Sequence, residues 1–81
     1  MTPENIAREE RINAMTSILI HANRNRVCRG YDEIAEAFGR AAKGIAIGVS
    51  QIHSVDEAKM IKQVQELVAR GFTAPVEIIL D

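Results

Sequence analysis

The chain has 81 residues, 47% hydrophobic and 26% charged, which is the composition of one small soluble globular domain. A formal net charge of −1 excludes a strong overall attraction to nucleic acid or to anionic lipid. With Cys28 as the only cysteine, no signal-peptide pattern and no apolar run long enough for a membrane span, the sequence predicts a cytoplasmic protein with a single domain over residues 1–81.

The first predicted element is a helix that begins at residues 2–4, Thr-Pro-Glu. Threonine caps helix N-termini, proline at the first helical position loses no needed N–H, and glutamate favours the positive end of the helix dipole. Ile12, Met15, Leu19 and Ala22 then recur every three or four residues. This spacing predicts a helix that continues to about Asn23.

A second, shorter helix is predicted to begin at Tyr31, with apolar positions at Ile34, Ala35 and Phe38. It stops at Gly39 or, in the version we favour, continues through residues 41–43 to Gly44, since glycine is the usual residue after a helix. Before it, residues 27–28 allow a very short extended segment.

The second half of the chain has the pattern of a strand–helix–strand unit. Residues 45–50 alternate large apolar with small side chains, which is typical of a strand with one buried face, and residues 76–80 form a second β-branched run. Between them a helix is predicted from Ser54 to about Arg70, with a capping box made by Ser54 and Glu57 and a left-handed stop at Gly71. Its predicted buried stripe consists of Ala58, Ile61, Val64, Leu67 and Val68.

These elements predict an α+β fold in the order helix–helix–strand–helix–strand. The two strands would be parallel, because a crossover helix joins them. Two strands leave open sheet edges, so we expect a homodimer in which a second copy completes the sheet. We find no coiled-coil heptad pattern in the sequence.

No residue pattern indicates catalysis, metal binding or a cofactor. Cys28 lacks a catalytic partner arrangement, and His21 and His53 have neither the spacing nor the companion cysteines of a zinc site. The glycines at positions 39, 44 and 48 do not form a phosphate-binding loop, since Lys43-Gly44 precedes a predicted strand rather than a helix. We therefore predict a protein that is not an enzyme.

Residues 31–39, Tyr-Asp-Glu-Ile-Ala-Glu-Ala-Phe-Gly, resemble the first helix and turn of a helix-turn-helix domain. In that motif a small alanine packs against the second helix and a glycine four residues later makes the turn. The resemblance covers about 20 residues and implies a DNA-binding transcriptional regulator with Ile45 as an apolar anchor. A second, winged-helix interpretation makes residues 54–72 the recognition helix, although the connection between the helices is then too long.

Five basic residues within one 20-residue window are the candidate binding residues: Arg24, Arg26, Arg29, Arg40 and Lys43. Arginine offers bidentate contacts, so the cluster favours recognition of an acidic protein surface, a phosphate or a nucleic-acid backbone. We expect a small regulator, adaptor or inhibitor that binds a macromolecular partner. Phage-encoded antagonists of host systems, anti-CRISPR proteins among them, are one such class. DNA binding is the alternative.

Overall fold

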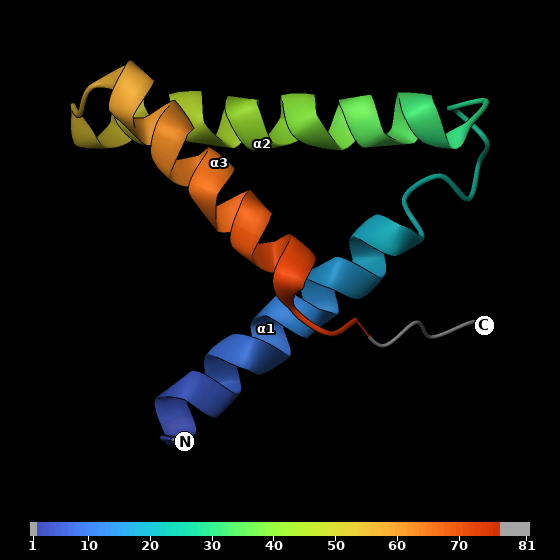
Figure 1. The fold of residues 1–81 in the computed structure, drawn as a ribbon, viewed down its shortest axis with the longest axis horizontal. Helices are drawn as coiled ribbons and strands as arrows, with labels where there is room; N and C mark the ends of the chain where they lie inside the picture. The colour runs from blue at the N-terminus through green and yellow to red at the C-terminus, as the bar shows by residue number, and fades with distance from the viewer. Residues whose placement is uncertain (1, 77–81) are drawn as a thin grey trace. The chain divides into compact units, whose positions relative to one another are not determined.

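The computed structural model describes residues 2–76, and every regular element among them is a helix (Figure 1). The helices are α1 (Pro3–Ile20), α2 (Tyr31–His53) and α3 (Glu57–Thr73). The predicted α+β fold is therefore wrong, because residues 2–76 contain no strand. The chain divides into two compact units, one with residues 2–29 and the other with Gly30–Val76.

The first unit contains α1 and the loop that follows it. The Thr2 side chain accepts a hydrogen bond from the Asn5 N–H at 3.2 Å, and Pro3 occupies the first helical position, as predicted. The helix ends at Ile20, three residues earlier than expected. In the loop, the Asn23 amide donates to the Cys28 carbonyl at 3.1 Å and accepts from the Cys28 N–H at 2.8 Å. This pair of bonds closes residues 23–28 into a turn, and residues 27–28 form no strand.

Residues 45–50 are helical, so the predicted strand is wrong. The small side chains that suggested a strand instead follow the helical repeat, at Ala42, Ala46 and Ser50. Ala46 is completely buried and Ser50 is 5% exposed, while the Ser50 hydroxyl donates to the Ile47 carbonyl at 2.7 Å. Small residues four apart let a neighbouring helix approach closely, and this packing stabilises a helix despite two glycines and several β-branched residues.

The connection between α2 and α3 consists of residues 54–56. Ser54 ends α2 in the left-handed conformation with φ of 54°, and Asp56 caps α3 by accepting from the Lys59 N–H at 3.0 Å. The predicted capping box was therefore misplaced by two residues. The predicted stop at Gly71 is also wrong, since α3 continues to Thr73. All of the second predicted strand except Val76 lies outside the described residues.

The second unit is a helical hairpin in which α3 runs back along α2 and diverges from it (Figure 1). Near the connection, Ile61 and Val64 of α3 are half-buried against α2, as predicted. Farther from the connection, Leu67 and Val68 are each 45% exposed. Ala58, at the start of α3, is exposed as well. The predicted apolar stripe is thus covered over only part of its length. The sheet edges that predicted a homodimer are absent from residues 2–76.

Candidate functional site

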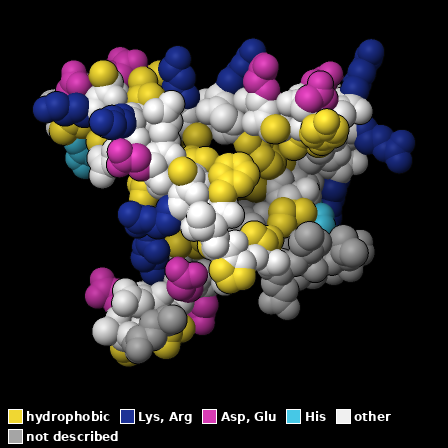
Figure 2. Space-filling model, viewed as in Figure 1, with side chains coloured by type: hydrophobic (Ala, Val, Ile, Leu, Met, Phe, Trp, Pro, Cys, Tyr) yellow, Lys and Arg dark blue, Asp and Glu magenta, His cyan; other side chains and the backbone are white. Residues whose placement is uncertain are grey.

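The diverging helices of the hairpin leave a groove of about 270 Å³ between them. Its walls are predominantly aliphatic, and the residues that line it are Gly39, Ala42, Lys43, Ile61, Val64, Gln65 and Val68. Three of these belong to α2 and four to α3, so the groove exists only because the two helices pack together. Figure 2 shows hydrophobic side chains gathered between the two helices, with charged side chains along the opposite edge of α2.

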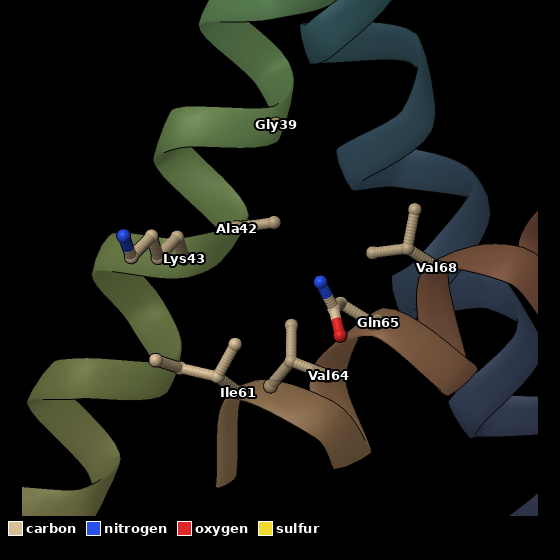
Figure 3. Close-up of a pocket in the computed structure, with 7 residues that line it drawn as sticks. All are labelled: Gly39, Ala42, Lys43, Ile61, Val64, Gln65 and Val68. Atoms are coloured by element: carbon tan, nitrogen blue, oxygen red, sulfur yellow. The ribbon is translucent and has the colours of Figure 1, made fainter. Parts of the chain in front are cut away.

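The close-up in Figure 3 shows aliphatic side chains of both helices on the groove, together with the polar side chains of Lys43 and Gln65. The methyl group of Ala42 points across the groove toward Val68, and Val64 stands between Ile61 and Gln65. The Gln65 amide lies between Val64 and Val68, and the Lys43 ammonium points away from α3. Such a groove is suited to an apolar side chain of a ligand, with hydrogen-bonding or acidic groups beside it.

The structure divides the predicted basic cluster between the two units. Arg24, Arg26 and Arg29 lie in the loop after α1, whereas Arg40 and Lys43 lie on α2. Arg40 forms an exposed ion pair with Glu36, four residues earlier, at 2.6 Å. Of the five residues, only Lys43 lines the groove. Binding by this cluster stays a prediction.

Within the loop, the hydrogen bonds between Asn23 and Cys28 fix the backbone that carries two of these arginines. Arg26 has a left-handed backbone with φ of 54°, and its N–H donates to the Asn23 carbonyl at 2.9 Å. The loop therefore presents Arg24 and Arg26 from a defined turn rather than from an extended linker.

Among residues 2–76 no group of three or more histidine, cysteine or acidic side chains is placed to hold a metal ion. Cys28 is a free, half-buried thiol whose backbone takes part in the loop hydrogen bonds. In the same part of the chain no helix has both the length and the apolar character needed to cross a membrane.

The segment that resembles a helix-turn-helix motif contains no turn. Residues 31–39 form the first part of α2, which passes through Gly39 and continues to His53 without interruption. The connection used in the winged-helix interpretation is three residues long, shorter than the sequence suggested. DNA binding itself stays a prediction, without the helix–turn geometry at Gly39 that motivated it.

A second apolar surface, which sequence reasoning missed, follows from the length of α2. Seven residues repeat with alternating spacings of three and four: Tyr31, Ile34, Phe38, Ala41, Ile45, Gly48 and Ile52. We call this row the α2 stripe. It has the a/d pattern of a coiled coil over three heptads, contrary to our expectation of no heptad. The predicted helix stop at Gly44 and strand at residues 45–50 concealed it.

The α2 stripe and the groove lie on different sides of α2. Counting 100° per residue, the centre of the stripe lies about 110° around the helix from Ala46, which is buried on the side of α2 that contacts α3. No α3 contact covers the ends of the stripe, where Tyr31 is 87% and Ile52 78% exposed. The hairpin thus has two exposed apolar surfaces, the groove between α2 and α3 and the α2 stripe.

Comparison with known proteins does not assign this chain to a family. No protein-family model, no curated protein and no solved structure matches it.

Proposed function

We propose that this chain is a non-enzymatic regulator, adaptor or inhibitor that binds a protein partner through the groove between α2 and α3. The observation that carries the proposal is the groove itself, an open apolar depression formed by two packed helices. Apolar side chains near its wider end, Leu67, Val68 and Phe72, are exposed, and Phe72 reaches 87%. Large exposed apolar patches of this kind mark interaction surfaces in soluble proteins.

The shape and charge of the groove favour an amphipathic helix of the partner as the bound element. Helices dock into grooves between helices by inserting apolar residues spaced three or four apart. Lys43 at the rim, together with Lys62 on the exposed side of α3, favours acidic residues on the flanks of such a helix. Of the ligands expected from the sequence, the proposal takes an acidic protein surface and places the centre of the interface at the groove.

The test is affinity capture from a lysate of the source organism, with and without nuclease, using the wild-type chain and two matched variants. Val68→Asp places a carboxylate in the groove, whereas Ala69→Asp places one on the adjacent, exposed position of α3 outside it. Circular dichroism first establishes that both variants keep their helix content.

We expect wild type and Ala69→Asp to recover the same protein regardless of nuclease, and Val68→Asp to recover little of it. A partner retained equally by Val68→Asp would show that the groove is not the binding site. Recovery that disappears after nuclease treatment would favour the DNA-binding alternative.

A further inference from the structure

We propose that the α2 stripe is a self-association surface through which two copies of this chain pair along α2 in antiparallel orientation. This inference is independent of the proposed function, because the stripe and the groove lie on different sides of the helix. It also replaces the sheet-based reason for a homodimer with one drawn from the helix.

The stripe is continuous along α2. Its a/d positions run from Tyr31 to Ile52, so over 22 residues the stripe spans about 33 Å at 1.5 Å per residue. Within the stripe Ile45 is 63% and Phe38 39% exposed, whereas Ile34 and Gly48 are half-buried. A row of a/d side chains is complementary to a copy of itself, because the side chains of one helix fit the spaces between those of the other.

The positions beside the stripe are uncharged. In the heptad frame that starts at Tyr31, the e and g positions are Ala35, Ala37, Ala42, Gly44, Val49 and Gln51. None is charged and most are small, so a second helix can approach closely without desolvating an ion. All five charged side chains of α2 lie at b, c or f positions: Asp32, Glu33, Glu36, Arg40 and Lys43.

The second half of α2 lacks charged side chains. From Gly44 to His53 it has no Asp, Glu, Lys or Arg, and large aliphatic side chains occur on several sides of it. A helix that is apolar around its circumference belongs in the interior of a bundle. In the hairpin, the fully buried side of this segment is the one that carries Ala46 and Ser50, while Ile45 and Ile52 are exposed. A second copy on the stripe covers the side that carries Ile45 and Ile52.

The exposed area of the stripe approaches that of a standard interface. The exposed surface of Tyr31, Phe38, Ile45 and Ile52 amounts to about 500 Å² per chain, which is the most that pairing removes from water at these four residues. The flanking small residues and Ile34 add to this value, which brings it near the roughly 800 Å² per partner of standard interfaces.

The distribution of charge selects the antiparallel orientation. A parallel pair places the acidic starts of two α2 helices, Asp32, Glu33 and Glu36, side by side with both helix dipoles aligned. An antiparallel pair separates the two acidic ends by the length of the helix and opposes the dipoles. Its two-fold axis then passes near Ala41, the middle of the stripe.

The first test is sedimentation equilibrium at micromolar concentration, with the wild-type chain, Ile45→Asp and Val68→Asp. We expect about 17.8 kDa, twice the 8.9 kDa of the chain, for wild type and for Val68→Asp, and 8.9 kDa for Ile45→Asp. A wild type that sediments only as the monomer would overturn the proposal. The stripe would then be covered by another segment of the chain or by another protein, and not by a second copy. A dimer that survives Ile45→Asp would show that the seam, the contact between the α2 stripes of the two copies, lies elsewhere.

The second test does not depend on the folding of Ile45→Asp. In a Cys28→Ser background, single cysteines are introduced as Ala41→Cys or Tyr31→Cys, and disulfide formation is followed after addition of copper–phenanthroline as oxidant. We expect rapid cross-linking at position 41 and none at position 31. No cross-linking at position 41 refutes the antiparallel seam, and so does efficient cross-linking at position 31.

The groove and the seam are separable in the same set of variants. Val68→Asp is expected to lose the protein partner and keep the dimer, and Ile45→Asp is expected to lose the dimer. If the groove proposal fails, the sedimentation and cross-linking results still test the seam. If the seam proposal fails, the capture experiment still tests the groove.

Discussion

Replacement of Gly44 by alanine is expected to stabilise the protein, and the reason lies in the helical conformation of residues 45–50. Gly44 is inside α2, and a Cβ atom built on it meets no other atom within 4 Å beyond its chain neighbours and the helix's own backbone. The substitution therefore neither removes a contact nor creates a clash. What remains is the difference in helix propensity, which favours alanine by about 0.8–1.0 kcal/mol in a helix interior.

A gain of this size is measurable by urea and thermal unfolding, followed by circular dichroism at 222 nm. For a chain of this length it corresponds to a rise in Tm of roughly 4–8 °C per kcal/mol. Wild type and variant must be compared at one protein concentration, because self-association also raises Tm.

The matched control is Gly30→Ala, the same chemical change at the N-cap of α2. Gly30 precedes the helix with an extended backbone, and an added Cβ lies 2.8 Å from a carboxylate oxygen of Asp32. Alanine is a poor N-cap, so here we expect a loss of about 0.5–1 kcal/mol. If Gly44→Ala is neutral or destabilising while Gly30→Ala behaves as expected, residues around Gly44 are not an unobstructed helix interior, and the reasoning fails.

Three further outcomes are expected. Asp56→Ala removes the N-cap of α3 and should lower the unfolding free energy by about 1 kcal/mol; an unchanged urea midpoint would contradict this role. Ala46→Leu should cost about 1–3 kcal/mol through overpacking, because Ala46 is fully buried, whereas Ala58→Leu at an exposed position should change stability by less than about 0.5 kcal/mol. Asn23→Ala removes both side-chain hydrogen bonds to Cys28, so amide exchange at the Cys28 N–H should accelerate; equal exchange rates would show that other contacts hold the loop.

Features set by neighbouring residues along the chain could be predicted from the sequence. The start of α1 follows from Thr2 and Pro3, whose capping and backbone restriction act within one helical turn. The third helix and the half-buried Ile61 and Val64 follow from their spacing. The exact N-cap of α3 could not be predicted from the sequence, because Ser54 and Asp56 are both good N-cap residues. In the structure Ser54 has a left-handed backbone and ends α2, so Asp56 caps α3.

The candidate site could be predicted only in part. Lys43 was selected for its charge and does line the groove, but the opposite wall belongs to α3, and no local pattern shows which side of α2 that helix contacts. The α2 stripe is present in the sequence, yet its heptad spacing has meaning only once Gly39, Gly44 and Gly48 are known to lie within one helix.

The sequence by itself determined the helix at each end of the described chain and the apolar side of α3, because hydrophobic spacing and capping act over a few residues. Tertiary packing decided the conformation of residues 45–50, where the same residues fit a strand with one small-residue face or a helix with a small-residue contact. The small side chains of Ala46 and Ser50 are compatible with both conformations. Their burial beneath α3, a helix that begins at Glu57, favours the helix, because close packing and backbone hydrogen bonding together outweigh the low helix propensity of the glycines and β-branched residues.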